Sequence, residues 1–359
     1  MIGIEEEQAV LRVMRGGALS GYRGSWGSWF YGGEEIKALE KEWAEKFKVK
    51  HAIACNSATS GLWLACAAVG TQEKQLANAK GYFVLHDGEV IVSPYSMTCS
   101  ASIPLHFGVK PVFADIESDY FCLDPEDVER KITENTKAII VVDLFGMPYD
   151  ADRINAIAKK HNLIVIEDAA QACGATYKGK YAGTLGDIGV FSLNTHKHIQ
   201  CGEGGIVVTD NDELAMKIRL LMNHAEAVNN DLQEEKHNLL IGMNLRMTEL
   251  SAAIAREQLK KLDGIIAWYR NHAEYFPVKV RPECESAFYR YAWREKDYNL
   301  RVSLLTAATL DEDFNIKKHY IKPINSMPLF ASLGYDQNQC PVCREVDEDI
   351  ILAFPKDVI

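Results

Sequence analysis

The sequence predicts an α/β fold, in which helices cover both faces of a mostly parallel sheet and a smaller C-terminal α+β domain follows. Between residues 51 and 210, short apolar runs alternate with helical stretches, an order typical of parallel sheets. Several runs, such as 138–142, are apolar throughout, as expected of strands covered on both faces. A chain of 359 residues also exceeds what one hydrophobic core usually serves. We therefore expect a large domain over 1–245 and a small domain over 246–359.

Seven strands are expected in the large domain, at residues 52–55, 89–93, 111–114, 138–143, 163–168, 190–192 and 206–209. Two helices have clear start signals, because Asp124 precedes Pro125 and the polar run 210–213 opens the amphipathic stretch 214–222. A longer helix is expected from Thr248 to Leu262, where Asp-Gly follows. In the small domain, 286–294 and 298–305 alternate like antiparallel strands. The connection at 71–88 is unusually long and suggests an added helix and hairpin.

The composition is that of a soluble globular protein, with 47% apolar and 25% charged residues. The net charge of −11, with no basic run to offset it, disfavours a nucleic-acid partner. The acidic N-terminus lacks the pattern of a signal peptide, and no apolar run is long enough to span a membrane. The nine cysteines, odd in number, then indicate reduced thiols in a cytoplasmic protein.

Lys197 has the clearest chemical context of any residue in the chain. It follows the apolar strand expected at 190–192 and precedes a Gly-Glu-Gly-Gly turn at 202–205, while Asp168 ends an earlier buried strand. A lysine and an aspartate in these places suit pyridoxal 5′-phosphate, because lysine binds the cofactor and aspartate pairs with its pyridinium nitrogen. Each residue alone has an ordinary alternative, a solvated loop lysine and a helix cap. The glycine-rich context favours the cofactor.

The turn at 56–60, Asn-Ser-Ala-Thr-Ser, is the expected phosphate site. It joins a strand to a helix, and the exposed N–H groups and dipole of a helix N-terminus favour an anion. An ordinary Ser/Thr helix cap is the commoner explanation of such a turn by itself. The company of Asp168 and Lys197 supports the phosphate interpretation.

Three other sequence features are not assigned a catalytic or metal-binding role. His196 and His198 flank Lys197, but their spacing gives no pair on one helix face and nothing completes a ligand set, so no metal is expected. Cys340 and Cys343 form a lone C-x-x-C, which we interpret as structural. An aromatic cluster amid glycines suggests a mobile or interface segment, with core packing as the alternative, and comprises Tyr22, Trp26, Trp29, Phe30 and Tyr31.

Taken in order, these motifs resemble the sugar-nucleotide aminotransferases of the DegT/DnrJ/EryC1/StrS type, a branch of the aspartate aminotransferase superfamily. The matching stretches run over nearly the whole chain, at 32–40, 56–60, 110–116, 167–171, 186–192, 197, 202–205 and 242–250. The resemblance implies the fold of PLP-dependent transferases of fold type I. It also implies pyridoxal 5′-phosphate as cofactor, with pyridoxamine 5′-phosphate as its intermediate form.

The resemblance also implies a role for each matching position. Lys197 binds the cofactor and moves a proton between the substrate carbon and the cofactor, and Asp168 pairs with the ring nitrogen. Gln171 lies near the phenolic oxygen, and Ser192 binds the phosphate together with Ser57, Ala58 and Thr59. Asn244 reaches the cofactor phosphate of a neighbouring subunit, which implies a homodimer with shared active sites.

The chain departs from the family pattern in three places. Met97 occupies the position that usually carries an aromatic residue stacked on the cofactor, although its polarizable sulfur can also cover a ring. The connection at 71–88 is longer than the family's, and the chain stops near 354–359 where a further helix is expected. Candidates for the substrate phosphates are Arg23, His319 and Lys322.

The expected activity is a two-stage amino transfer, from an amino acid such as L-glutamate to a keto group of a nucleotide-linked deoxysugar. A keto-cyclitol or another small ketone is an alternative acceptor, since the catalytic core would look the same. A related sugar dehydratase is a second alternative, but there a histidine replaces the lysine. The alternative outside catalysis is a binding protein that keeps the fold and senses an aminated ligand.

Overall fold

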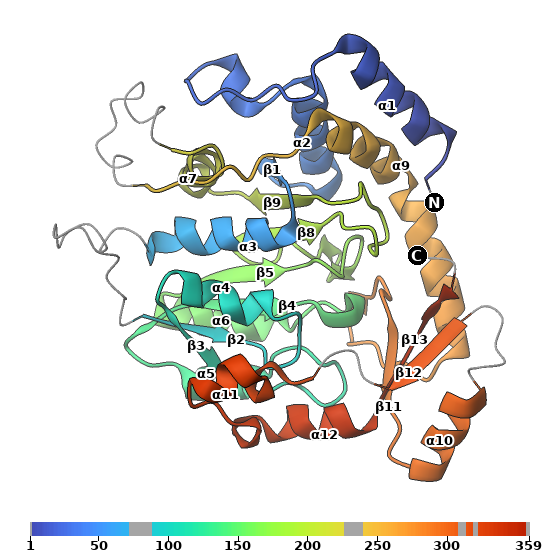
Figure 1. Cartoon of the computed structure of the whole chain (residues 1–359). Coiled ribbons are helices and arrows are strands. Elements are labelled where there is room, and N and C mark those ends of the chain that lie inside the picture. The colour runs from blue at the N-terminus through green and yellow to red at the C-terminus, as the bar shows by residue number, and fades with distance from the viewer. Residues whose placement is uncertain (1, 72–87, 226–239, 308–313, 319–321, 357–359) are drawn as a thin grey trace.

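The computed structural model describes residues 2–71, 88–225, 240–307, 314–318 and 322–356 (Figure 1). Its centre is a sheet of seven strands. In sheet order they are β1 (His51–Cys55), β9 (Gly205–Thr209), β8 (Ile188–Ser192), β5 (Ile164–Asp168), β4 (Thr136–Val142), β2 (Glu89–Val92) and β3 (Lys110–Phe113). Within this sheet only β9 runs antiparallel to its neighbours. The seven predicted strands are confirmed, each within two residues at either end.

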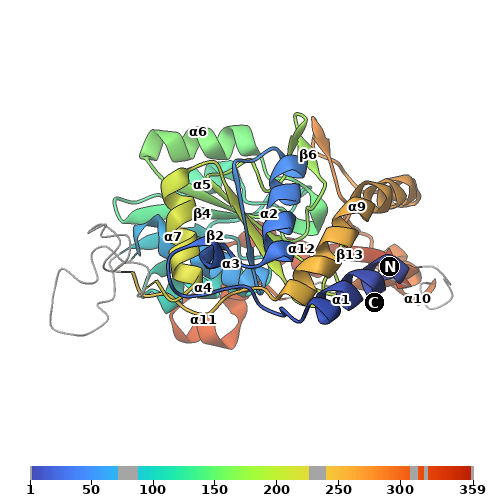
Figure 2. The ribbon, with the colours of Figure 1, turned by 90° about the horizontal axis from the view of Figure 1, so that it is seen from above.

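Helices cover both faces of this sheet, as Figure 2 shows from above. One face carries α3 (Ala58–Cys66), α4 (Cys99–His106) and α7 (Asp212–Met222), and the other carries α2 (Glu34–Phe47), α5 (Pro125–Lys131) and α6 (Ala151–His161). The alternation of side chains along β8 explains the two layers. Val190 lies against Gly61 of α3, where an added Cβ would come within 2.7 Å of it, and Phe191 packs on Trp43 of α2 with ring centroids 5.2 Å apart. The predicted α/β/α sandwich is confirmed.

The two predicted helix starts are also confirmed. The Asp124 side chain accepts a hydrogen bond from the N–H of Glu126 at 3.0 Å, which caps α5. The Asn211 side chain accepts from Glu213 and Leu214 at 2.9 and 3.1 Å and caps α7.

A second, antiparallel sheet follows in the C-terminal part, in the order β11 (Tyr291–Arg294), β13 (Ile350–Pro355) and β12 (Phe314–Lys318). The strand predicted at 298–305 is wrong, because this segment is helix α10 (Tyr298–Ala307). Asp297 starts that helix by accepting from the N–H groups of Asn299 and Leu300 at 2.8 and 3.1 Å, so the cap outweighs the alternating pattern.

The strand predicted over 286–294 begins only at Tyr291. Ser286 instead lies in the loop before β11. Its hydroxyl donates to the carbonyl of Gly146, which follows β4, at 2.9 Å and so fixes this loop beside the large sheet. Phe288 has a φ of +49°, which no extended strand adopts.

The long helix α9 (Glu249–His272) does not end at Leu262 as predicted. A glycine inside a helix costs about 1 kcal/mol relative to alanine, but burial of Ile266 and Tyr269 on the following turns offsets that cost. In Figure 1, α9 starts beside α1 (Ile4–Gly16) and α2 and runs toward the second sheet. A division of the chain into domains near residue 245 stays a prediction.

The last helices, α11 (Pro328–Ser332) and α12 (Pro341–Asp349), return to the β3 edge of the large sheet. The carboxylate of Asp115 accepts from the N–H groups of Val342 and Cys343 at 2.8 and 2.9 Å. Cys340 and Cys343 are buried in this contact, and all nine cysteines are free thiols. A small third sheet joins β6 (Thr176–Tyr177), β7 (Lys180–Tyr181) and β10 (Cys284–Glu285).

Within the described ranges, no helix combines the length and the apolar character needed to cross a membrane. Most of the predicted addition at 71–88 lies outside the described residues, and α3 continues into a π-helical turn at Ala67–Thr71.

Candidate active site

The carboxyl ends of β1, β8 and β5 meet at one edge of the large sheet, which is where open α/β sheets bind ligands. Ser57 lies just after β1, Ser192 ends β8 and Asp168 ends β5. Lys197 stands in the loop that leads from β8 to β9. The topology therefore brings these four predicted site residues to the same edge.

The predicted phosphate turn has the geometry of a capped helix N-terminus. The hydroxyl of Ser57 accepts from the N–H of Ser60 at 3.1 Å and so begins α3. The first N–H groups of a helix have no acceptor within it, so those of Ala58 and Thr59 are available to an anion. Gly205 pairs with Ser192 in the sheet and lies so close to Ser57 that a Cβ at Gly205 would come within 2.5 Å of its carbonyl carbon. The missing side chain lets the turn and Ser192 approach each other.

Asp168 is a buried carboxylate, with 4% of its surface exposed. The Ser100 hydroxyl donates to Oδ2 at 3.0 Å, and the N–H of Ala170 donates to Oδ1 at 3.2 Å. Burial raises the pKa of Asp168 above its ordinary value, while these two donors and the charge of Lys197 act against that shift. A cation beside this carboxylate would relieve the cost of its ionisation.

The first turn of α4 connects the phosphate turn with Asp168. Burial raises the pKa of the Cys99 thiol to about 11, with the charge of Asp168 adding to the rise and hydrogen bonds to Thr59 and Ser100 opposing it. Met97 lies two residues earlier and is 48% exposed. An uncovered methionine at the rim of this site is available to a ring, but its stacking role stays a prediction.

Lys197 is half-buried, and its Nζ lies 4.6 Å from the centroid of the Tyr289 ring. Its loop is closed by backbone hydrogen bonds, among them one from Thr195 to the carbonyl of Gly202 at 2.9 Å. Gly202 has a φ of +84°, which favours glycine at this turn. The glycine-rich sequence after Lys197 thus shapes the loop that presents the lysine.

The two histidines beside Lys197 have different surroundings. His196 is exposed, whereas His198 is buried with its Nε2 2.9 Å from the carbonyl oxygen of Ala287. Burial lowers the pKa of His198 to about 3, helped by the charges of Lys197 and Arg290, so its imidazole is neutral at neutral pH. No group of three or more potential metal ligands gathers anywhere in the described part of the chain.

Gln171 is buried, and its Oε1 accepts from the N–H of Phe145 at 2.8 Å. Phe145 has a φ of +58°, so the glutamine side chain supports an unusual turn. Its contact with the cofactor stays a prediction.

Asn244 is exposed, and its Oδ1 accepts from Nε of Arg246 at 2.8 Å. Arg246 also donates to Asn223 at 3.1 Å, and the carbonyl of Leu245 accepts from the N–H of Asn56 at 2.9 Å. The segment around Asn244 is thereby fixed to the end of β1.

Of the three candidates for the substrate phosphates, the structure describes Arg23 and Lys322. Arg23 is exposed and stacks over Trp29, with its Cζ 5.4 Å from the ring centroid. Lys322 is exposed, and His319 lies outside the described residues. Sequence reasoning missed Ser100 and Tyr289, because neither is part of a local motif and each approaches the site only through the fold.

The comparison with known proteins agrees with this geometry. The profile of the DegT/DnrJ/EryC1/StrS aminotransferase family matches residues 23–354. The chain belongs to this family. Membership makes the protein an aminotransferase that depends on pyridoxal 5′-phosphate, with fold type I.

Several relatives of the chain within the family have named activities or structures. GDP-perosamine synthase of Caulobacter vibrioides is 39% identical over 85% of this chain and 81% of its own length. UDP-N-acetyl-3-dehydro-alpha-D-glucosamine 3-aminotransferase of Acidithiobacillus ferrooxidans is 32% identical over 89% of this chain and 83% of its own. The crystal structure of DesV from S. venezuelae, in complex with a ketimine intermediate, is 26% identical, covers 99% of this chain and 90% of its own, and superposes with a TM-score of 0.81.

The residues at the sheet edge fit the family's cofactor. A buried carboxylate at Asp168 suits a protonated ring nitrogen, and the capped helix start at Ser57 suits a phosphate. Because Gly205 has no Cβ, the turn at Ser57 can lie close to the strand pair that carries Ser192. Lys197 projects from the loop that closes the same edge.

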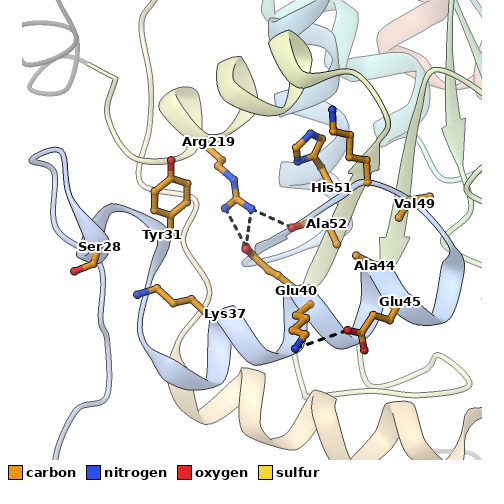
Figure 3. A pocket seen from close by; sticks show the side chains of 12 residues that line it. Ser28, Tyr31, Lys37, Glu40, Ala44, Glu45, Val49, His51, Ala52 and Arg219 are labelled. Carbon is orange, nitrogen blue, oxygen red and sulfur yellow. Dashed lines mark hydrogen bonds and ion pairs between the residues drawn. The ribbon is translucent and has the colours of Figure 1, made fainter.

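A pocket of about 650 Å³ lies elsewhere, between α2, α7 and the amino end of β1 (Figure 3). None of the predicted site residues lines it. Figure 3 shows dashed lines between Glu40 and Arg219, whose closest contact is 2.8 Å. The lining residue Lys50 pairs with Asp212 at 2.6 Å. We call it the α2–α7 pocket. It is not the cofactor site, because it opens at the opposite end of β1 from Ser57.

Proposed function

We propose that this aminotransferase moves an amino group from an amino acid, L-glutamate, to the keto carbon of a nucleotide-linked deoxysugar. The observation that carries the proposal is the meeting of Lys197, buried Asp168 and the capped turn at Ser57 on one sheet edge. The nucleotide-sugar acceptor is supported by the named activities of the two relatives described above. The reaction balances without an external oxidant, because amino acid and keto sugar become 2-oxo acid and amino sugar in two successive stages.

When bound, pyridoxal phosphate delocalises the electron pair that remains on the substrate carbon after its proton leaves. With the cofactor in place, Lys197 Nζ would hold the proton that leaves the substrate carbon and then return it, so it would act as base and then as acid. The Asp168 carboxylate would lie beside the ring nitrogen and keep it protonated. Two roles at the ring are proposed from sequence, for Gln171 near the phenolic oxygen and for Met97 on one face.

The phosphate would be held by the N–H groups and hydroxyls of the turn at the start of α3 and by Ser192. The proposed residues of the turn are Ser57, Ala58 and Thr59. The negative charge of a phosphate here would be stabilised by the partial positive charge that the helix dipole places at the N-terminus of α3. The small side chains leave room for the phosphate oxygens to approach the backbone.

We further propose a homodimer in which Asn244 reaches the cofactor phosphate of the second subunit. Asn244 is exposed, and two large apolar neighbours, Ile241 and Met243, are 48% and 47% exposed. Trp26 and Trp29 of the aromatic segment are also 40% and 48% exposed, while Phe30 is buried. Apolar surface of this extent supports an interface with a second copy. The proposed location is the cytoplasm, as expected from the free thiols.

A lysine at position 197 favours transamination over sugar dehydration, in which a histidine takes that place. His198 supports this interpretation, because it is buried, neutral and held by the carbonyl of Ala287.

The test uses the protein loaded with pyridoxal phosphate. L-glutamate should convert its absorbance from that of the pyridoxal form to that of the pyridoxamine form, and a keto nucleotide sugar should restore it. A panel of 3-keto and 4-keto nucleotide sugars would identify the acceptor. Absence of any conversion with every amino donor tried would contradict the proposal.

A further inference from the structure

Tyr289 carries two cations on its ring. Lys197 Nζ lies 4.6 Å from the ring centroid, and Arg290 Cζ lies 4.1 Å from the same centroid. The guanidinium and the lysine nitrogen are therefore held within the span of one aromatic side chain. His198 lies against the edge of Tyr289, with centroids 5.8 Å apart, and is neutral.

The position of Arg290 is well fixed. Its backbone N–H donates to the carbonyl of Phe145 at 3.4 Å. In the side chain, Nη1 donates to the carbonyl of Tyr289 at 2.8 Å and Nη2 donates to the Tyr289 hydroxyl at 3.4 Å. The Phe354 ring of β13 also lies beside the guanidinium, 4.6 Å from Cζ. Contacts with two rings, one carbonyl and one hydroxyl orient the planar group, and the remaining N–H donors of its fork have no partner among the described residues.

Arg290 has no carboxylate partner among the residues that the structure describes. Other arginines nearby in the sequence do have one, since Arg281 pairs with Glu117 and Arg294 pairs with Asp349 at 2.7 Å. A half-buried guanidinium is costly to leave without an anion, so this one indicates a ligand that supplies negative charge.

We propose that Arg290 binds the α-carboxylate of the amino-acid donor. This inference rests on the proposed function. In an amino acid the carboxylate is attached to the carbon that bears the reacting amino group, so its anchor must lie close to Lys197 Nζ. The diphosphate of a nucleotide sugar is separated from the keto carbon by the sugar ring and belongs farther away. A guanidinium also matches a carboxylate with two parallel hydrogen bonds.

The test follows each half of the reaction by absorbance. In Arg290→Gln, the L-glutamate concentration that gives half-maximal conversion to the pyridoxamine form should rise about ten- to a hundredfold, the loss typical of a charge-assisted pair. For the conversion back to the pyridoxal form, the half-maximal concentration of a keto nucleotide sugar should stay within about twofold of the wild-type value. The matched control is Arg301→Gln in α10, because Arg301 also stacks over a tyrosine, Tyr298, at 5.7 Å, and it should leave both halves unchanged.

Donors with and without the α-carboxylate give a second readout. The wild-type protein should favour L-glutamate over 4-aminobutanoate, which lacks that carboxylate, and Arg290→Gln should lose most of this preference. A direct binding measurement, calorimetric titration of glutarate into the pyridoxal form, should show weaker binding by the variant. Thermal unfolding shows whether each variant is folded. Arg290→Lys keeps the positive charge, so it should bind glutarate more tightly than Arg290→Gln.

Three outcomes would overturn the assignment: unchanged glutamate dependence, an unchanged donor preference, or a loss confined to the nucleotide-sugar half. The last outcome would assign Arg290 to the substrate phosphates. The failure of the proposed function looks different, because wild-type protein would then show no conversion with any amino donor.

Discussion

The sheet edge around Lys197 and the α2–α7 pocket differ in how their charged side chains are paired. In the pocket, Arg219 pairs with Glu40 and Lys50 with Asp212, at 2.8 and 2.6 Å. At the sheet edge, Lys197 and Arg290 share the ring of Tyr289, and neither makes a salt bridge among the described residues. The difference indicates that charges without partners mark this active site better than the size of a hollow does. The comparison predicts that substitutions at the sheet edge change chemistry and those in the pocket change stability.

The largest effect is expected for Lys197→Ala. Removing the group that moves the proton should slow conversion by glutamate by about 10²- to 10⁴-fold or more. Stopped-flow absorbance measures the rate, and thermal unfolding checks that the variant is folded. Conversion at the wild-type rate would assign the proton transfer to another residue.

Asp168→Asn should come next, with a rate lower by about ten- to a hundredfold because the ring nitrogen loses a charged partner. In the protein without cofactor, the same substitution should not lower the stability of the fold. Burial raises the pKa of Asp168 in the folded state, so the folded chain holds the proton more tightly and stability falls as pH rises above the unfolded pKa. At neutral pH the cofactor-free variant should therefore unfold at a temperature no lower than wild type. A much lower unfolding temperature would show that the carboxylate stabilises the fold.

Glu40→Gln tests the pocket side of the comparison. This change leaves the largely buried guanidinium of Arg219 without its charged partner, which costs about 3–5 kcal/mol when a buried pair is broken. Urea unfolding should show this loss, while the glutamate dependence of the folded variant stays within about twofold of wild type. A selective loss of glutamate affinity would connect the pocket to catalysis.

Lys41→Ala should have the smallest effect. Lys41 pairs with Glu45 at 3.8 Å on the pocket rim, and both side chains are well exposed, at 77% and 66%. Exposed pairs of this kind contribute about 0–1 kcal/mol. Unfolding free energy and conversion rate should both stay close to wild type, and a clear drop in either would show that the rim has a role.

The sequence predicted the sheet well because its strands are apolar runs that local composition reveals. Lys197, Asp168 and the turn at Ser57 were found for a related reason, since each lies directly at a strand end. Prediction failed at α10, where the capping side chain of Asp297 outweighs an alternating pattern.

Some of the site could not be predicted from local sequence. Tyr289 and Arg290 are far along the chain from Lys197, and no motif marks them. They reach the lysine because Ser286 fastens the loop before β11 to Gly146, at 2.9 Å. Ser100 likewise meets Asp168 only through the packing of α4 on the sheet.

The most direct test of the central claim locates the cofactor on the chain. Protein loaded with pyridoxal phosphate is reduced with borohydride, digested and analysed by mass spectrometry. The account predicts a stable pyridoxyl adduct on the peptide that contains Lys197, and its disappearance after preincubation with L-glutamate. An adduct on a different lysine, or an adduct on Lys197 that glutamate never removes, would contradict it.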